Sequence, residues 1–459
     1  MPNEVVEAIV AEFRQEVERY CGQVHDWVKE GGNGGLERWE EWVRELVQPI
    51  QRRLLEGVVE AAGRGYEGTQ QRCVNCRGWA RYVGDRPHRI RTLVGELRET
   101  KRAYYHGCGC AGGWFPQDRR LNLDAEGRSL GLRRVVTLMG AVSPYEKATD
   151  YLWEVGRIAI SRTTVERVTE EVGWQVEEWQ EARQQRALAG LQKREGPGPE
   201  RLYVEADGTT VPMRVEPQQT RDAQQRVQAK VEYKEVKLGA VFEAHLDPEG
   251  KPEAGPRTYT GTFGDAQTCV TQVGAEAKAC GADSAEEIVL LNDGGSWIWN
   301  RMPEAFAGKK VTQILDCRHP QERFTEIAKR VFGEGTKEAR SWSEEQRRAL
   351  LEGRIQQVIE SIEKLAPKCK ESTQYIRQAL GYLRTNAHRM NYGELRAQGY
   401  YIGSGVIESA CKHIVAARLK QAGMKWSRQH VPKVLALRVC RASGWWDAFW
   451  KERAQRAAA

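Results

Sequence analysis

Apolar residues at the start of the chain recur every three or four positions, which is the period of one helix face. The pattern runs from Val6 to Trp27, stops at the sequence GGNGG, and resumes from Trp39 to Ile50. Because glycines interrupt a helix, we expect two helices that either fold back on one another or form a coiled-coil seam with a second chain. Residues 1–65 are therefore predicted to be a helical hairpin or a dimerisation segment.

A second helical pattern covers residues 129–180. A short helix, the turn GRIAIS and a further helix capped by Ser161 resemble a helix-turn-helix, whose second helix would enter the major groove of DNA. Thr163, Thr164 and Arg167 are the candidate DNA-binding residues of that helix, and a plain three-helix packing module is the alternative interpretation. The Gly-Pro-rich stretch that follows predicts a boundary near residue 195, so this domain would cover residues 121–195.

From residue 201 the pattern changes to apolar strands alternating with helices. RLYVEADGTTVPMRV predicts a strand that ends at Asp207, with Gly208 beginning a turn, and YKEVKLGAVFEAHL and RTYTGTF would complete an antiparallel meander. DAQTCVTQVGAEAKACG predicts an amphipathic helix, and EEIVLLND and KKVTQILD predict two further strands that end at Asp293 and Asp316. This order of elements predicts an α/β, RNase H-like sheet over residues 200–320.

The remainder of the chain is expected to be mostly helical. Residues 321–400 predict an all-α insertion between the last strand and a later helix. That helix lies in YIGSGVIESACKHIVAARLKQAGMKWS, where Ser404 would cap the N-terminus and Glu408 would lead an otherwise apolar, inward-facing row. Residues 401–459 would supply this helix and a basic C-terminal tail.

Three carboxylates occupy positions that meet in an RNase H-like sheet. Asp207 and Asp293 follow the first and fourth strands, and Glu408 lies on the helix packed against the sheet. Carboxylate oxygens are the ligands that hard divalent cations take, so the three would hold two Mg²⁺ or Mn²⁺ ions. Taken singly, Asp before Gly is more often part of a turn, and Glu408 could instead pair with Lys412.

Four cysteines form a separate candidate metal site. Cys73 and Cys76 form C-x-x-C, and Cys108 and Cys110 form C-x-C, on either side of a segment that predicts two strands turned at Gly95. Paired thiolates beside a β-hairpin are typical of a zinc ribbon, here residues 66–120. The C-x-C pair closes a tighter loop than usual. Replacement of one thiolate by His106, or four unliganded cysteines, are the open alternatives.

The distribution of charge along the chain indicates a candidate binding partner. The net charge is +7, and from Ser409 to the end eleven Lys or Arg residues stand against two acidic residues. Such a tail suits DNA or RNA, although a solvated helix face gives the same composition. No apolar run reaches the ~20 residues of a membrane span, and the N-terminus is acidic, so we expect a cytoplasmic protein. The candidate DNA-binding residues of the tail are Lys412, Arg418, Lys420, Lys425 and Arg428.

Four stretches resemble the bacterial insertion-sequence transposases of the ISKra type, a DDE lineage with Mutator-like relatives. They are LYVEADGTTVPM, VLLNDGGSWIWN, ILDCRH and GYYIGSGVIESACKHIVAARLKQAGMKWS, and the resemblance extends over about residues 72–450. By this resemblance Asp207, Asp293 and Glu408 match the catalytic triad, and Asp316 to His319 matches a D-x-x-H motif. His319 would then orient the scissile phosphate or the attacking water.

The resemblance implies a transposase that binds terminal inverted repeats and catalyses Mg²⁺-dependent cleavage and strand transfer. Its partner would be double-stranded DNA, it would act as a homodimer or higher oligomer, and it would associate with the bacterial nucleoid. The C-x-C pair departs from the usual C-x-x-C of the family. Three alternatives stay open: an RNase H-like nuclease without strand transfer, a domesticated DNA-binding protein without catalysis, and structural carboxylates beside an RNA-binding tail.

Overall fold

The computed structural model shows a mixed α/β protein with a helical N-terminal segment. The chain divides into two compact units, Met1–Thr169 with Asp447–Ala459, and Glu170–Trp446. The division falls within helix α6, and the domain boundaries expected from the sequence stay predictions. No helix in the described part of the chain is both long enough and apolar enough to cross a membrane. The described residues are 3–29, 35–73, 76–109, 112–192, 194–215, 231–367 and 369–458.

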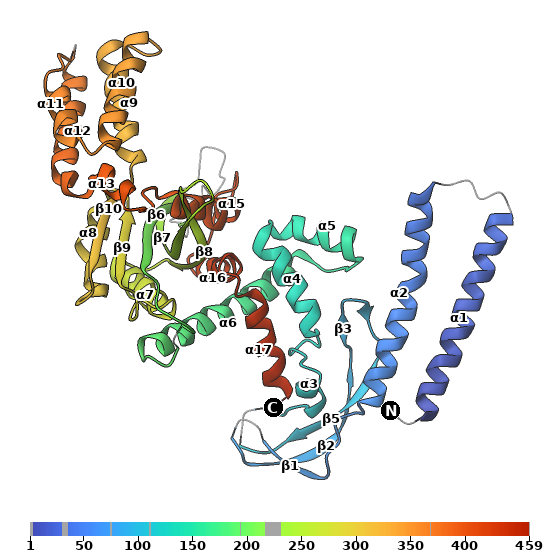
Figure 1. The fold of residues 1–459 in the computed structure, drawn as a ribbon. Helices are drawn as coiled ribbons and strands as arrows, with labels where there is room; N and C mark the ends of the chain where they lie inside the picture. Colours follow the sequence, from blue (N-terminus) through green and yellow to red (C-terminus); the bar gives the residue numbers. More distant parts are fainter. Residues whose placement is uncertain are drawn as a thin grey trace, which may run out of the picture. The chain divides into compact units, whose positions relative to one another are not determined.

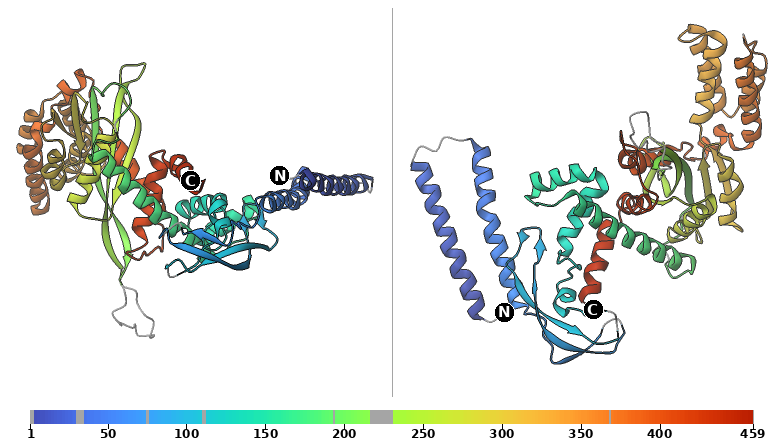
Figure 2. Two further views of the ribbon diagram at one scale, coloured as in Figure 1. Left: turned by 90° about the horizontal axis from the view of Figure 1, so that it is seen from below. Right: turned by 180° about the vertical axis from the view of Figure 1, so that it is seen from behind.

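The first unit begins with two antiparallel helices, α1 (Asn3–Lys29) and α2 (Leu36–Ala61), which lie side by side in Figure 1 and in the right-hand view of Figure 2. The Arg53 guanidinium binds both carboxylate oxygens of Glu12 across the pair. A tryptophan from each helix also packs edge to face against the other. These contacts confirm the predicted hairpin within one chain.

A three-stranded antiparallel sheet follows, with the strand order β1-β2-β5. The two strands predicted to turn at Gly95 form only a short hairpin, in which Arg91 and Thr92 of β3 pair with Glu96 and Gly95 of β4. The long strand β5 pairs with β2 instead. The pairing with β2 buries Ala80, Ala103 and Tyr105 in one small apolar cluster, which the local alternation could not reveal. The strands are β1 (Gln70–Arg72), β2 (Trp79–His88), β3 (Arg91–Thr92), β4 (Gly95–Glu96) and β5 (Thr100–His106).

The helix-turn-helix candidate is helical, as predicted. The Ser161 hydroxyl accepts a hydrogen bond from the backbone N–H of Thr164 at 3.3 Å, so Ser161 caps α6. The C-terminal helix α17 belongs to the same unit, where Asn122 donates to the backbone carbonyl of Arg453. The helices are α3 (Pro116–Arg120), α4 (Leu130–Val142), α5 (Tyr145–Gly156), α6 (Arg162–Leu188) and α17 (Trp446–Ala458).

The second unit contains a five-stranded mixed sheet with the order β10-β9-β6-β7-β8. β6, β7 and β8 form the predicted antiparallel meander, while β9 and β10 run parallel to β6. Every residue of β9 is buried, which explains its continuous apolar sequence. The strands are β6 (Arg201–Arg214), β7 (Val231–Leu246), β8 (Pro252–Thr262), β9 (Glu287–Asn292) and β10 (Val311–Leu315).

Strand β6 does not end at Asp207, as the sequence predicted. It continues to Arg214, with Asp207 opposite Leu238 and Gly208 opposite Lys237 of β7. Pairing with β7 satisfies the backbone groups that a turn at Gly208 would have used. Asp207 therefore lies within a strand, at the point where the neighbouring strand β9 ends.

Helices cover both faces of this sheet. A Cβ added at Gly239 of β7 would meet Val273 of α7, whereas one at Gly261 of β8 would meet Val439 of α16. Gly239 is paired with Thr260, and successive residues of a strand point to opposite faces, so α7 and α16 lie on opposite faces. Apart from the helical segment after Ser404, the helices outside the insertion are α7 (Ala266–Ala279), α8 (Ser296–Arg301), η1 (Met302–Phe306) and α16 (Val431–Ala442).

The segment between β10 and residue 400 is helical, which confirms the predicted all-α character of the insertion. These helices are drawn in orange in Figure 1. They pack through a common apolar core that includes Phe324, Leu350 and Ile362. They are α9 (Arg318–Phe332), α10 (Lys337–Leu351), α11 (Ile355–Glu363), α12 (Lys370–Asn386), η2 (Ala387–Arg389) and α13 (Tyr392–Ala397).

The helix expected after Ser404 is shorter and less regular than predicted. It consists of α14 (Gly405–Ala410), a π-helical turn η3 (Cys411–Ala416) and α15 (Ala417–Leu419), and it ends before most of the basic segment. The backbone of Trp426 instead hydrogen bonds with β6, donating to Pro212 at 3.1 Å. These bonds to the sheet replace the helical bonds that the sequence pattern predicted.

Candidate functional site

The candidate site lies at the edge of the sheet where the parallel strands β9 and β10 end and β6 continues beyond them. Asp293 and Asp316 follow β9 and β10, and Asp207 lies within β6 at the level where β9 ends, because the three strands run in the same direction. The Asn292 side chain accepts a hydrogen bond from the Ala206 N–H at 2.5 Å, which joins β9 to β6 immediately before the two aspartates. The sheet topology thus gathers three carboxyl groups from distant parts of the sequence.

Asp207 is half-buried and contacts the helical segment above the sheet. The Cys411 thiol donates to its Oδ2 at 3.3 Å. Burial raises the pKa of Asp207; the Cys411 hydrogen bond opposes this shift, and the negative charge of Asp293 adds to it. Asp207 and Asp293 are therefore electrostatically coupled, and a cation between them would favour the ionised form of Asp207.

Asp293 occupies the turn between β9 and α8. Its Oδ1 accepts a hydrogen bond from the Gly295 N–H at 3.0 Å. A Cβ added at Gly294 would lie 2.3 Å from the Tyr382 ring, so only glycine fits between this turn and α12. The sequence N-D-G-G is thus explained by close packing that presents Asp293 at the sheet edge.

Asp316, His319 and Glu408 form a second, tighter group. One potential ligand atom from each of them lies within 4.8 Å of the others. Asp316 is fully buried, and its Oδ1 accepts from the N–H groups of Ser404 at 3.1 Å and Arg318 at 3.2 Å. Its Oδ2 has no hydrogen-bond partner among the described residues and lies 3.8 Å from Nε2 of His319.

The structure places the predicted triad at one edge but not in one compact group. Of the described residues, Asp207, Asp293 and Glu408 do not bring ligand atoms within 4.8 Å of one another, whereas Glu408 does so with Asp316 and His319. Cys411 lies one helical turn beyond Glu408 and contacts Asp207, so α14 and η3 connect the two groups. The catalytic assignment of the triad therefore stays a prediction.

Ser404 occupies the predicted cap position without acting as a side-chain cap. Its hydroxyl donates to Glu408 Oε1 at 3.1 Å, while its N–H donates to Asp316. Among the described residues Glu408 has no ion pair with Lys412, the alternative partner considered from the sequence. Ser404 thus holds two of the three members of the tighter group in place.

Glu205 is a site residue that the sequence interpretation missed. It is fully buried, and its Oε2 accepts a hydrogen bond from the Ile407 N–H at 2.8 Å. Burial raises the pKa of Glu205 well above its usual value, and the charges of Asp316 and Glu408 raise it further. Its spacing of two residues from Asp207 put both side chains on one face of β6, which was the available signal.

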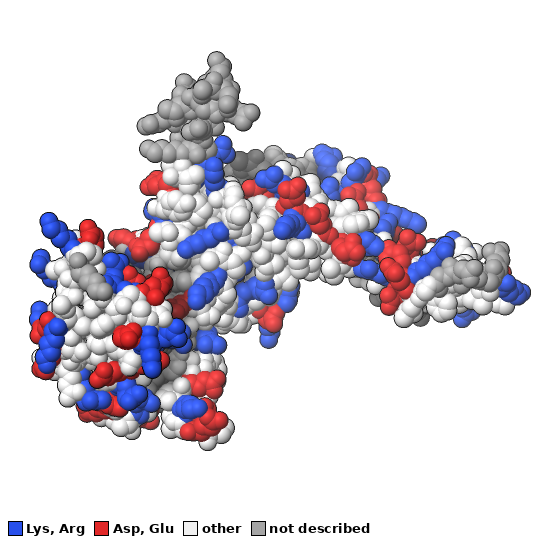
Figure 3. Space-filling model, turned by 90° about the horizontal axis from the view of Figure 1, so that it is seen from above, with Lys and Arg blue, Asp and Glu red and all other residues white. Residues whose placement is uncertain are grey.

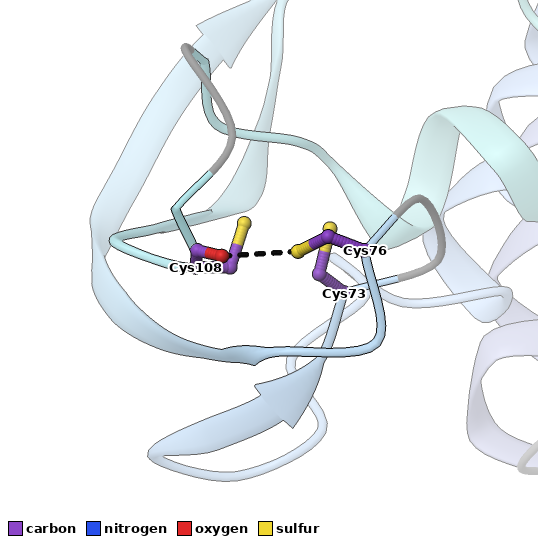
Figure 4. Close-up of side chains that lie close together, drawn as sticks. All are labelled: Cys73, Cys76 and Cys108. Atoms are coloured by element: carbon purple, nitrogen blue, oxygen red, sulfur yellow. Dashed lines mark hydrogen bonds between the residues drawn. The ribbon is translucent and has the colours of Figure 1, made fainter.

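The cysteine cluster lies in the first unit (Figure 4). Sulfur atoms of Cys73, Cys76 and Cys108 lie within 4.8 Å of one another, and the Cys76 thiol donates to the Cys108 carbonyl at 3.0 Å. This cluster could hold a structural metal such as zinc. Cys110 lies outside the described residues, and His106 is not a member of the group.

A cavity of about 860 Å³ in the first unit has a basic lining. It lies between α2, the β3–β4 hairpin and the start of α6, where Ser161 and Thr164 form part of its wall. Arg52 makes no ion pair with any described residue, and its Nε is buried without a hydrogen-bond partner. The charged lining consists of Arg44, Arg52, Arg91, Arg128 and Arg157 together with Glu41, Glu45 and Glu96.

The residues predicted to bind DNA differ in accessibility. Thr163, Lys412, Lys425 and Arg428 are exposed, whereas Arg418 is only 1% exposed. The Arg418 guanidinium packs 4.8 Å from the centre of a tryptophan ring, so its burial does not fit the predicted direct contact with DNA.

Two further candidates already have polar partners within the chain. Arg167 forms an ion pair with Glu126, and Lys420 donates to the Thr209 hydroxyl. On the face drawn in Figure 3, basic and acidic side chains are interspersed. The surface charge visible there does not by itself mark a DNA-binding patch.

Comparison with known proteins does not indicate a family for this chain. No family model matches the chain, and no curated protein is significantly similar to it. The function is therefore inferred from the geometry and chemistry of the sites above.

Proposed function

We propose that the protein is a DDE transposase of a bacterial insertion sequence, which binds terminal inverted repeats and catalyses metal-dependent DNA cleavage and strand transfer. The observation that carries this proposal is the placement of Asp207 within β6 beside Asp293 at the end of the adjacent parallel strand β9, with Glu408 on a helix bonded to the same edge. The strand order β8-β7-β6-β9-β10, in which only β7 runs in the opposite direction, supports an RNase H-like core.

The donor set at this edge suits divalent cations. Carboxylate oxygens suit Mg²⁺ or Mn²⁺, and the buried, unpartnered Oδ2 of Asp316 is an oxygen that a cation would satisfy. Asp207, Asp293 and Glu408 would hold the catalytic ions, which when bound lower the pKa of a water and stabilise the leaving oxygen of a phosphodiester.

The protein's own groups would hold the reacting strand in position. Cys411 and the Gly208 N–H fix the carboxylate of Asp207, and the Gly295 N–H fixes that of Asp293. His319 is half-buried beside Asp316, where it would orient a phosphate or the attacking water. Preorganised groups of this kind are the main protein contribution to phosphoryl transfer, because little covalent chemistry is required of the enzyme.

DNA binding would come mainly from the first unit. Thr163 is exposed at the start of α6, and the arginine-lined cavity lies beside the same helix start. Exposed Lys412, Lys425 and Arg428 would add contacts from the second unit. The cysteine cluster would bind zinc and stabilise the β-sheet module, and pairing of two transposon ends would require at least a homodimer.

The catalytic proposal is tested with DNA that carries the inverted repeats flanking the gene. Purified protein with Mg²⁺ should cleave at the repeat ends, and pre-cut ends should join to target DNA. Asp207→Asn, Asp293→Asn and Glu408→Gln should each lower the rates of cleavage and joining at least about 100-fold. Each change removes a proposed ligand of the metal ions that would stabilise the transition state. Duplex binding should change less than about twofold, and Glu249→Gln, in an exposed turn, is the matched control.

Other outcomes identify the alternatives. Hydrolysis without joining would indicate an RNase H-like nuclease. Duplex binding with neither reaction, and biological activity that survives Glu408→Gln, would indicate a domesticated DNA-binding protein. A preference for RNA over duplex DNA would overturn both the transposase and these DNA-based alternatives.

The contribution of the cavity is tested by salt dependence. Removing one phosphate-binding side chain should reduce the slope of log affinity against log salt by about one. We expect Arg52→Gln to weaken binding to an arbitrary duplex with this change in slope, because Arg52 has no competing ion pair with a described residue. Arg19→Gln, on the exposed face of α1, should leave the slope unchanged.

A further inference from the structure

We propose that Asp316, His319 and Glu408 form a divalent-metal site of their own, whose mixed nitrogen and oxygen donors select a transition metal of the Mn²⁺ class over Mg²⁺. The proposal deepens the proposed function, since it distributes the metal binding of the sheet edge over two groups of residues that share Glu408. The site itself follows from the geometry of this group, whether or not the protein cleaves DNA.

The spacing of the three residues matches a shared ion. Metal–ligand bonds of about 2.0–2.2 Å place ligand atoms up to about 4.4 Å apart. Ligand atoms of Asp316, His319 and Glu408 lie within 4.8 Å of one another, so small side-chain adjustments would suffice. Asp207 and Asp293 do not form a comparable group with Glu408 among the described residues.

Asp316 supplies an independent indication of a ligand. It is fully buried, its Oδ1 has two backbone donors, and its Oδ2 has no donor in the part of the chain that the structure describes. A buried carboxylate oxygen without a partner is costly, and a cation would remove that cost. The Oδ2 atom faces Nε2 of His319 at 3.8 Å, on the side where the ion would bind.

The surrounding residues hold the ligands in a fixed arrangement. Ser404 donates through its N–H to Asp316 and through its hydroxyl to Glu408. His319 lies in the first turn of α9, three residues after Asp316, and its Nδ1 lies 3.9 Å from Glu322. At 3.9 Å the exposed Glu322 makes no hydrogen bond with the ring, but a small side-chain movement would make it the outer carboxylate that commonly orients a metal-binding histidine.

The donor types determine which metal is favoured. Imidazole nitrogen suits transition metals such as Mn²⁺, whereas Mg²⁺ prefers oxygen ligands in a regular octahedron. The Asp207 and Asp293 carboxylates offer oxygen alone and would suit Mg²⁺. Zn²⁺ would be drawn to the thiolates of the first unit, so Mn²⁺ is the better probe of this site.

The test uses the full-length protein, freed of divalent cations other than zinc, with Mn²⁺ alone as the probe. Electron spin-echo spectroscopy of bound Mn²⁺ should show coupling to a ¹⁴N nucleus. His319→Gln should remove that coupling and weaken Mn²⁺ binding about tenfold or more, with a change of less than about threefold for Mg²⁺. Asp316→Asn should also weaken Mn²⁺ binding, because it removes the buried anionic ligand.

The matched control is His245→Gln, which changes an exposed histidine of β7 in the same unit. It should leave the nitrogen coupling and both affinities unchanged. If Asp316→Asn fails to fold, as thermal unfolding would show, the partly exposed His319 still provides the test. Absence of coupling in the unaltered protein, or its persistence in His319→Gln, would overturn the site.

The experiments distinguish failure of this metal site from failure of the proposed transposase function. Nitrogen-coordinated Mn²⁺ in a protein that neither cleaves nor joins DNA would support this site and contradict the transposase. Cleavage and joining with Mg²⁺, without any nitrogen coupling from Mn²⁺, would support the transposase and contradict this site.

Discussion

The Glu205 carboxyl group lies inside the interface between β6 and α14, beside the charged groups of the candidate site. Burial and the nearby charges of Asp316 and Glu408 raise its pKa well above its usual value. A protonated Glu205 still accepts the hydrogen bond from the Ile407 N–H, and it adds no further negative charge to the edge. In its protonated form Glu205 would attach the helix that carries Glu408 to the sheet without adding to the repulsion among the carboxylates.

A second buried group, His88 in the first unit, gives a pH-dependent prediction. Burial, followed by the positive charge of Arg102, lowers the pKa of His88 to about 4, from about 6.5 in an unfolded chain. Between these values the unfolded chain binds a proton that the folded chain excludes, so stability is complete above about pH 6.5 and falls as the pH approaches 4. His88→Asn should reduce the loss of stability between pH 7 and pH 5.

Urea unfolding at the two pH values measures this effect. His245→Asn, at an exposed position, should leave the pH dependence as it is in the unaltered protein. An equally steep loss of stability in His88→Asn would show that His88 does not control it.

At the scale of elements, the cysteine cluster depends on how two turns approach each other. Cys73 accepts a hydrogen bond from the Arg77 N–H, and its own N–H donates to the Gly78 carbonyl, so the first turn closes on itself. The Cys76 thiol then reaches the Cys108 carbonyl of the second turn. The distance between the turns is therefore set by the residues that separate them.

Gly78→Ala tests this arrangement. The added Cβ would lie 2.9 Å from the Cys108 carbonyl oxygen and 3.3 Å from the Cys76 sulfur, so the two turns must move apart. We expect bound zinc, measured by elemental analysis, to fall from about one to well below one per chain, with a lower melting temperature. The Cβ added by Gly112→Ala would meet no atom of the described residues within 4 Å, so this control should retain the metal. Full zinc content in Gly78→Ala would contradict the assignment of the cluster.

At the scale of the whole molecule, the N-terminal hairpin leaves part of its apolar surface exposed. Val10 is 52% exposed, Phe13 42% and Val43 46%, although all three belong to the apolar faces of α1 and α2. The end of α2 is different, since Val59 packs with Ile90 of the β-sheet module. Apolar side chains left open along paired helices are typical of a surface that a second chain covers.

Oligomeric state tests that interpretation. The protein should sediment as a dimer or larger species, and the triple change Val10→Gln, Phe13→Gln and Val43→Gln should shift it to the monomer, because it removes the apolar area buried between chains. Analytical ultracentrifugation over a concentration series is the measurement. Val155→Gln alters a valine of α5 that is even more exposed, at 77%, and should leave the assembly intact. A dimer unaffected by the triple change would place the interface elsewhere.

Much of the fold was accessible from local patterns. The hairpin helices, the meander of β6, β7 and β8, and the helical insertion follow from periodicities of 3.6 or 2 residues, and β9 and β10 follow from short apolar runs. The cap at Ser161 followed in the same way, because its hydrogen bond joins residues three apart. Such features depend on contacts between residues that are close in the sequence, so a short stretch of sequence is enough to predict them.

The site was only partly accessible, because its contacts join residues far apart in the chain. Asp207 and Asp293 could be placed at strand ends, but the continuation of β6 beyond Asp207 depends on pairing with β7. The grouping of Glu408 with Asp316 and His319 depends on Ser404, whose bond to Asp316 spans 88 residues, and Glu205 is joined to Ile407 across 202 residues. Packing between the sheet and α14 fixes these pairs, and no local pattern encodes that packing.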